Sequence, residues 1–333
     1  SSELLVLTMM GNSQAPRNRG ASNEWGFTFF VYMRFSITFK SIDAKSPSIA
    51  NKRFMKKALW GIACWILSIT ACQSNKPNNT FCINNDTLTI SLKECGSITD
   101  FLKHANDSIE HIIISGALVK NNMSELRKHF SAPYGAFQSL DISGCNITEN
   151  NCIEEGAFES CHLLTDISLP EGIKRIGAYA FFDCNSLKSI HIPKKVSVIQ
   201  KCTFMGCESL ETIELPSSIT HIDEHAFMGC KMLHDIVIPD NVVSIGYASF
   251  DGCTSLTNIT LPETLNHISK FAFYQSPLET IYCKASFPPT IYPSTFSANN
   301  ATLYILQTYE DLYQQSLWGR VFQKIIITTE DIP

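Results

Sequence analysis

The chain has 333 residues, of which 44% are hydrophobic and 17% are charged, which supplies enough apolar material for a continuous core and excludes a wholly disordered chain. Residues 1–71 hold nine of the 26 Lys/Arg and three of the 31 Asp/Glu, so the part from Cys72 onward has 17 basic and 28 acidic residues and a net charge of -11. This acidic balance, with no run of Lys/Arg after residue 71, argues against nucleic acid as a partner.

An export signal is predicted at residues 55–71. It begins with Met55-Lys56-Lys57, continues through an apolar stretch of about a dozen residues and ends in small residues, which are the three parts of a secretory signal peptide. A helix that crosses a bilayer needs about 20 residues, so this stretch is too short. Its end, Ile69-Thr70-Ala71-Cys72, resembles a bacterial lipobox, which implies that Cys72 is the lipidated N-terminus of the mature protein. The alternative is a plain secretory signal with a chance cysteine.

The regions around this signal are predicted as follows. Residues 1–54 fit no structural class, and we interpret them as disordered upstream sequence in front of a misplaced start. Residues 72–85 are predicted to be a polar tether, and residues 86–152 an N-terminal cap with a degenerate first repeat. Within this cap we expect a helix over 97–105 opened by a capping box, a buried strand at 112–114, a second helix over 124–130 and the first solenoid strand at 140–142.

Residues 153–283 repeat with a period of 23 residues. The recurring isoleucines are Ile153, Ile176, Ile199, Ile222, Ile245 and Ile268. Phenylalanine recurs as Phe158, Phe181, Phe204, Phe227, Phe250 and Phe273. Cysteine recurs as Cys161, Cys184, Cys207, Cys230 and Cys253, with Ser276 in the sixth place. Several residue types that keep one spacing over six periods indicate a stacked array.

Each unit predicts one coil of a solenoid. An I-x-L pair such as Ile167 and Leu169 predicts a short strand with two inward side chains, and the proline that follows ends it because proline has no N–H for the ladder. An Ala-Phe segment such as residues 178–181 predicts a helical turn that closes the coil. One unit cannot bury its own apolar side, so stacked units share a core, with parallel strands about 4.8 Å apart.

The segments 177–184 (G-A-Y-A-F-F-D-C) and 187–193 (L-K-S-I-H-I-P) resemble the BspA-like leucine-rich repeats, a family of bacterial surface proteins. The resemblance covers roughly residues 153–281. It implies an α/β solenoid, a right-handed coil with a parallel β-sheet on one face and short helical turns on the other, capped at both ends. It also implies adhesion to host proteins such as fibronectin or fibrinogen.

Residues 284–333 are predicted to form a C-terminal cap that covers the last coil. We expect a strand over 302–306, a helix that begins with a capping-box pattern at 308–311 and a strand at 325–327. Trp318 and Phe322 are interpreted as core residues of this cap.

The cysteine column is interpreted as buried free thiols that behave as small hydrophobic side chains. On this interpretation Cys207→Ser destabilises by about 1–2 kcal/mol, and Cys207→Ala by the same amount or less. A disulfide between two of Cys82, Cys95, Cys145 and Cys152 stays open. His221 and His225 are spaced i, i+4, but no HExxH frame surrounds them, and we interpret them as surface histidines. No metal site, cofactor or catalytic motif is predicted, so we expect a protein that is not an enzyme.

We therefore expect an exported lipoprotein, anchored by its lipid in the outer membrane or at the cell surface, that binds another protein. The expected role is an adhesin for host extracellular-matrix or microbial surface proteins, and the alternatives are a glycan-capture or enzyme-accessory lipoprotein or a structural spacer. The sequence leaves the oligomeric state open. Outward strand positions differ from unit to unit while inward ones hardly change, so the strand face is the predicted binding surface. Its candidate residues are Asp166, Ser168, Ser189, His191, Thr212, Glu214, Asp235, Val237, Asn258 and Thr260.

Overall fold

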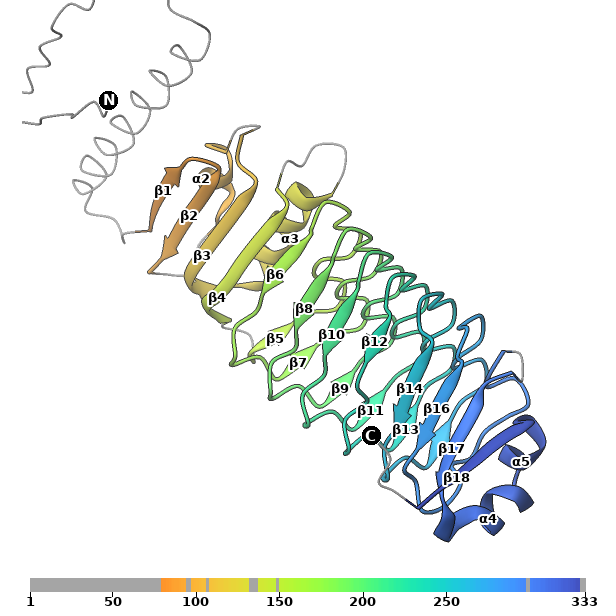
Figure 1. Cartoon of the computed structure of the whole chain (residues 1–333). Coiled ribbons are helices and arrows are strands. Elements are labelled where there is room, and N and C mark those ends of the chain that lie inside the picture. The colour runs from red at the N-terminus through yellow and green to blue at the C-terminus, as the bar shows by residue number, and fades with distance from the viewer. Residues whose placement is uncertain are drawn as a thin grey trace, which may run out of the picture. The chain divides into compact units, whose positions relative to one another are not determined.

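The computed structural model describes residues 79–93, 97–105, 108–131, 137–147, 150–297 and 300–329 (Figure 1). All of them belong to the unit Ile49–Pro333. The predicted upstream sequence (1–54), the signal peptide (55–71) and Cys72 lie outside the described residues. Among the described residues no helix is both long and apolar enough to cross a membrane.

Successive coils of the chain each add one strand to a sheet that is parallel from β2 onward and that we call the strand face (Figure 1). Its first part has the order β1-β2-β3-β4-β6-β8-β10-β12, and β14-β16-β17-β18 continues it through a bridge between Val237 and Thr260. The strands are β1 (Thr80–Asn84), β2 (Thr87–Leu92), β3 (His111–Leu118), β4 (Ser139–Ile147), β6 (Asp166–Ser168), β8 (Ser189–His191), β10 (Thr212–Glu214), β12 (Asp235–Ile236), β14 (Asn258–Leu261), β16 (Thr280–Cys283), β17 (Thr302–Leu306) and β18 (Lys324–Thr328). The solenoid architecture predicted from the repeat is confirmed.

Each coil also has a two-residue strand that ends at its recurring isoleucine. We number the coils 1 to 6 by these isoleucines, from Ile153 to Ile268. The two-residue strands are β5 (Cys152–Ile153), β7 (Arg175–Ile176), β9 (Val198–Ile199), β11 (His221–Ile222), β13 (Ser244–Ile245) and β15 (His267–Ile268). They pair in parallel with one another, so each coil contributes to two sheets rather than to the single one predicted.

The Ala-Phe segments close the coils by tight turns and not by the predicted helical turns. In coil 2 the residues Tyr179 and Asp183 have φ of 57° and 58°, and a left-handed residue ends any right-handed helix. Alternate N–H groups bond to the next coil, as in Tyr179 N–H to the Lys201 carbonyl at 3.0 Å, while those between them close local turns, as in Ala180 N–H to the Gly177 carbonyl at 3.2 Å. The ladder between coils therefore overrides the local preference for a helix.

The recurring phenylalanines form a continuous stack along the core. Neighbouring rings from Phe158 to Phe296 lie 5.2–5.5 Å apart between centroids, with interplanar angles of 2–12°. The rings from Phe158 to Phe273 are fully buried. Removal of one ring would leave a cavity with an aromatic neighbour on each side.

The N-terminal cap differs from its prediction in several bounds. Strand β1 pairs antiparallel with β2, so the predicted tether over 72–85 is wrong for residues 80–84. Helix α2 (Thr99–Leu102) is shorter than predicted, and α3 (Lys120–Phe130) begins four residues earlier. The predicted capping box is not formed as such, because Glu125 of α3 accepts the N–H of Ile98 at 3.1 Å, while Asp100 pairs with Lys103.

The C-terminal cap forms as the predicted strand–helix–strand unit. After β17 the chain continues through η2 (Gln307–Tyr309), α4 (Glu310–Gln315) and α5 (Leu317–Val321) to β18. No side chain caps the start of η2 or α4, so the capping-box prediction is wrong here. Trp318 and Phe322 lie in the core, as predicted, and the indole N–H of Trp318 donates to the Pro289 carbonyl at 2.7 Å.

Candidate functional site

The ten predicted strand-face residues lie in two ladders on one sheet surface. The first ladder pairs Asp166 with Ser189, Ser189 with Thr212, and Thr212 with Asp235 in register, and Asn258 continues it on β14. The second ladder consists of Ser168, His191, Glu214, Val237 and Thr260, with His191 paired to Glu214 and Val237 to Thr260. Parallel strands stand about 4.8 Å apart, so each ladder repeats a side-chain position at that interval.

Burial alternates along each of these strands. In β6, β8 and β10 the middle isoleucine is buried while both neighbours are exposed. Val237, in the middle of the second ladder, is 70% exposed, which is unusual for an aliphatic side chain on a sheet. The predicted phase of the strands is therefore correct, and the ten residues form one accessible surface.

The ladders are acidic in the first half of the array. Asp166, Glu214 and Asp235 belong to them, and no Lys or Arg occupies a ladder position from Asp166 to Thr280. The imidazole of His191 lies 3.3 Å from a carboxylate oxygen of Glu171 in the loop after β6, so a protonated His191 would be partly neutralised. This half of the face thus favours cationic groups on a partner.

Aromatic side chains extend the second ladder beyond the repeat. Tyr282 of β16 pairs in register with Tyr304 of β17, and their ring centroids lie 4.9 Å apart at 35°. The sequence points to Tyr282 as the next outward residue, but Tyr304 follows it by 22 residues in the region assigned to the C-terminal cap. The strand face therefore carries a pair of tyrosines at this end.

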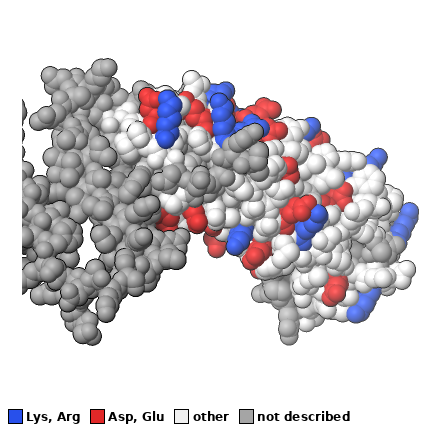
Figure 2. All heavy atoms as spheres, turned by 90° about the horizontal axis from the view of Figure 1, so that it is seen from above, with Lys and Arg blue, Asp and Glu red and all other residues white. Residues whose placement is uncertain are grey.

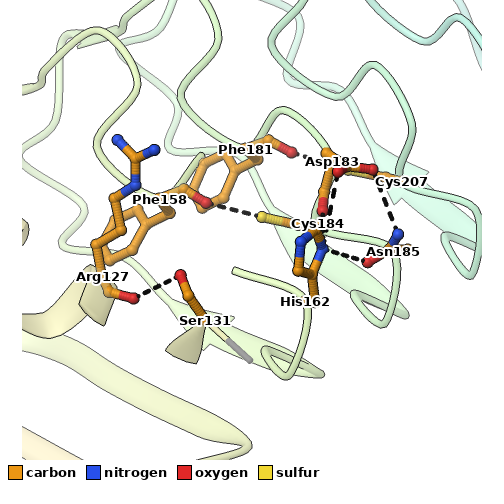
Figure 3. A network of polar contacts seen from close by, with 9 residues as sticks. All are labelled: Arg127, Ser131, Phe158, His162, Phe181, Asp183, Cys184, Asn185 and Cys207. Carbon is orange, nitrogen blue, oxygen red and sulfur yellow. Dashed lines mark hydrogen bonds and ion pairs between the residues drawn. The ribbon is translucent and has the colours of Figure 1, made fainter. Parts of the chain in front are cut away.

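The cysteine column is buried and reduced, and it also donates hydrogen bonds (Figure 3). The thiol of Cys184 donates to the Phe158 carbonyl at 3.0 Å, and that of Cys207 donates to the Phe181 carbonyl at 3.2 Å. Cys230 and Cys253 repeat the contact, and Ser276 makes it with its hydroxyl to Phe250 at 2.6 Å. Burial raises the pKa of Cys184, Cys207, Cys230 and Cys253, so these thiols stay protonated donors at neutral pH. The interpretation as small hydrophobic side chains was incomplete, because the slot requires a donor.

The other cysteines that the structure describes are also free. They include Cys82, Cys145 and Cys152, whereas Cys95 lies outside the described residues, so a bridge to Cys95 is not tested. Burial raises the pKa of Cys145 to about 12, which leaves it an unreactive thiol.

The histidines hold loops and do not assemble a metal site. Nδ1 of His162 lies 3.0 Å from the Asp183 carbonyl and 2.8 Å from the Asn185 amide oxygen, which joins coil 1 to coil 2 (Figure 3). His221 contacts the Thr220 hydroxyl at 2.8 Å. Within the described ranges no group of three or more His, Cys, Asp or Glu side chains is arranged to bind a metal ion.

A hollow of about 740 Å³ lies between α3 and the turn of coil 1. Its charged walls pair with one another or with neighbours, as Lys120 does with Glu154 at 3.7 Å and Arg127 with Glu159 at 2.9 Å. Two of its charged side chains are therefore already matched inside the protein.

Comparison with known sequences supports the repeat assignment. The family described as BspA type leucine rich repeat region matches the chain in six copies, over residues 131–236 and 224–331. No curated protein matches the chain.

Solved structures with similar coils come from several bacteria. The pneumococcal vaccine antigen PcpA is 17% identical, with a TM-score of 0.46, over 67% of this chain and 63% of that one, so the chain spans less than two thirds of its length. A leucine rich cell surface protein from Faecalibacterium prausnitzii is 16% identical, with a TM-score of 0.38, over 77% of this chain and 95% of that one. A leucine-rich repeat protein from Bacteroides ovatus is 19% identical, with a TM-score of 0.34, over 75% and 69% of the two chains.

Proposed function

The chain belongs to the BspA-type leucine-rich-repeat family, and we propose that it is a surface protein that binds another protein through its strand face. The observation that supports this most is the pair of exposed, in-register ladders over an invariant buried core. Such a surface is wide and rigid, and its chemistry changes from coil to coil without cost to the core. The finer proposal is an adhesin for host extracellular-matrix or microbial surface proteins, which follows from the family and not from a ligand.

The proposal includes a lipid anchor at Cys72. The order of positive, apolar and small residues before Cys72 supports an exported lipoprotein. Lipid chains on that cysteine would hold the protein at a membrane, and the solenoid would supply recognition. Binding rather than catalysis is proposed because the charged groups of the face are exposed, and the one ion pair among its described residues joins His191 to Glu171 of a neighbouring loop.

The charge pattern suggests how a partner is recognised. Acidic positions are frequent in the first half of the ladders, whereas Val237, Tyr282 and Tyr304 follow in the second half. Acidic groups increase the association rate of a basic partner, and apolar or aromatic groups contribute most of the affinity. On the face that Figure 2 shows, Lys and Arg are interspersed with Asp and Glu and do not form a basic patch, which also fits a protein partner rather than nucleic acid.

Surface plasmon resonance on immobilised fibronectin and fibrinogen tests the strand face. The triple variant His191→Ala/Glu214→Ala/Asp235→Ala should weaken binding at least tenfold at an unchanged melting temperature. The matched control is Glu208→Ala/Lys231→Ala, which removes an exposed ion pair that lies outside the ladders and contributes little to stability. Equal binding of the triple variant and the parent would exclude the first half of the face, and no binding to either protein would argue against a matrix adhesin.

The tyrosine pair favours glycan capture as a second candidate function. Sugar rings pack on aromatic side chains, and the half-buried Thr280 lies in the neighbouring ladder, where its hydroxyl can bond to a sugar. Tyr282→Ala and Tyr304→Ala should then abolish binding on a glycan array and leave fibronectin binding intact. Loss of both activities in the same variants would assign the tyrosines to the protein-binding surface.

A further inference from the structure

A run of aromatic rings crosses coils 4 to 6 at their turns, away from the strand face. The rings belong to His225, Tyr247, Phe271 and Tyr274. Successive centroids lie 5.3, 5.6 and 5.4 Å apart with interplanar angles of 69°, 79° and 81°, so each ring stands nearly perpendicular to the next. Tyr247 is 42% exposed and Tyr274 is 41% exposed. The turns of these coils therefore present an accessible aromatic cluster.

A carboxylate without a partner lies on the middle coil of this cluster. Asp251 occupies the position after the recurring phenylalanine, where coils 2, 3, 4 and 6 have Phe182, Met205, Met228 and Tyr274. Coil 1 also has a carboxylate there, but that of Glu159 pairs with Arg127 at 2.9 Å. Its Oδ1 atom is buried and has no hydrogen-bond partner among the described residues. Only one other buried side-chain oxygen or nitrogen in the described part of the chain shares that state, and it is Oγ of Ser249 in the same coil. Native proteins rarely leave such atoms unpaired, so this concentration in one coil requires an explanation.

The backbone ladder places Asp251 between the coils that supply the rings. Gly229 of coil 4 donates its N–H to the Asp251 carbonyl at 2.7 Å, and Gly252 donates to the Tyr274 carbonyl of coil 6 at 2.9 Å. Burial raises the pKa of Asp251, and the charge of His225 acts in the opposite direction, which places the two side chains in electrostatic range. Asp251 is thus a direct neighbour of the aromatic run.

The lysines nearest in sequence to the cluster are engaged elsewhere. The ammonium of Lys231 lies 2.6 Å from a Glu208 carboxylate oxygen, and that of Lys270 lies 5.4 Å from the ring centroid of Tyr292. The Asp251 carboxylate can therefore accept hydrogen bonds and lies near aromatic side chains, but neither of these lysines pairs with it.

We propose that Asp251 and the rings of His225, Tyr247, Phe271 and Tyr274 form a second binding site, which takes the protonated side chain of an arginine or lysine from a partner protein. The negative faces of aromatic rings attract a cation, and the exposed part of the half-buried Asp251 carboxylate can accept its N–H donors. A quaternary ammonium group has charge but no N–H, so it meets only half of the requirement. A cation beside the carboxylate offsets the cost of its partial burial in the free protein.

Nuclear magnetic resonance of the ¹⁵N-labelled full chain tests the site, with acetyl-arginine amide and tetramethylammonium as probes. The titration is run at pH 8, where both probes carry their full charge. Acetyl-arginine amide should shift the amide signals of Tyr247, Asp251 and Tyr274 with a Kd of about 10 mM, as expected for one side chain. Tetramethylammonium should bind at least fivefold more weakly.

Two variants separate this site from general charge attraction. Asp251→Asn keeps the shape and should weaken acetyl-arginine amide at least tenfold, with its remaining spectrum proving that it is folded. Asp166→Asn removes a carboxylate from the strand face and should bind like the parent. Absence of shifts at these amides, unchanged binding by Asp251→Asn, or equal affinity for tetramethylammonium would each overturn the proposal. The strand-face triple variant should retain this binding, so failure here and failure of the strand face are distinguishable.

Discussion

Replacement of Cys207 by serine should destabilise the array less than replacement by alanine, although serine is the more polar residue. The thiol of Cys207 donates to the Phe181 carbonyl at 3.2 Å, and Ser276, in the sixth place of the column, makes the equivalent contact to the Phe250 carbonyl through its hydroxyl at 2.6 Å. A hydroxyl in this slot thus has an acceptor ready. The sequence alone predicts that serine costs as much as alanine or more, because it shows no partner for the hydroxyl. The Phe181 carbonyl supplies that partner, so the expected order of the two variants reverses.

The magnitude follows from what each variant loses. Alanine loses the hydrogen bond, worth about 0.5–1.5 kcal/mol, and leaves a small cavity that adds about 0.5 kcal/mol. The Phe181 carbonyl keeps one partner, the N–H of Cys184 at 3.2 Å, so the full penalty of an orphaned acceptor does not apply. Serine keeps the bond and loses mainly the apolar contacts of the sulfur. We expect a cost of about 1–2 kcal/mol for Cys207→Ala and below about 1 kcal/mol for Cys207→Ser.

Urea unfolding under reducing conditions, followed by circular dichroism, measures the difference. The midpoint should fall in the order parent, Cys207→Ser, Cys207→Ala at an unchanged slope. The reciprocal pair serves as control, since Ser276→Cys should be nearly neutral and Ser276→Ala should cost as much as Cys207→Ala. A serine variant that is less stable than the alanine variant would refute the hydrogen-bond argument and restore the purely hydrophobic interpretation of the column.

Three further predictions concern other parts of the chain. Cys72→Ala should move the protein from the membrane fraction to the soluble fraction, and its retention in the detergent phase after partition would contradict the lipid anchor. Gly246→Ala should lower the urea midpoint more than Gly229→Ala. A Cβ at Gly246 would lie 2.5 Å from the backbone carbonyl carbon of Asp223, whereas a Cβ at Gly229 would meet nothing closer than 3.9 Å and would be strained only by a φ of 74°. Equal midpoints for the two variants would contradict this argument. Asp251→Asn should stabilise the free protein at pH 7 and leave its stability unchanged at pH 3. Burial raises the folded-state pKa of Asp251, so the parent loses stability as pH rises from the unfolded-state pKa through the folded-state pKa. A gain in stability that persists at pH 3 would exclude that cause.

The sequence predicts the repeat and the phase of its strands because both follow from which side chains must be buried. Inward isoleucines such as Ile190 and Ile213 recur at one spacing, and their burial fixes which neighbours face solvent. The same argument predicts Trp318 in the core of the C-terminal cap. Periodicity of apolar residues therefore suffices for the core and for the identity of the exposed ladders.

Turn conformation is less visible in the sequence. Cys202 and Phe271 adopt φ of 53° and 59°, although neither is a residue that favours the left-handed region. Hydrogen bonds to the next coil compensate for this local strain, as from Phe271 N–H to the Ser294 carbonyl at 2.9 Å. A local pattern of residues contains no signal for such an inter-coil bond, so the turns were predicted as helical. Strand β1 was missed for a similar reason, since its pairing with β2 and not its polar composition holds it in place.

A solenoid presents each side-chain position several times, so a departure in one coil can be compared with the same position in its neighbours. In the cysteine column, Ser276 changes the atom but keeps the donor and its carbonyl acceptor, so that departure is structural. In the column after the phenylalanine, two coils have a carboxylate: that of Glu159 pairs with Arg127, whereas that of Asp251 has an unpaired buried oxygen. Nothing in the coil compensates for that cost, while exposed rings of the adjacent coils supply the remaining surroundings that a cation prefers. On the strand face, the same comparison between coils finds exposed residues that vary without any cost to the core. The two surfaces therefore differ in kind: the strand-face residues are free to vary, whereas Asp251 destabilises its coil unless a ligand binds there.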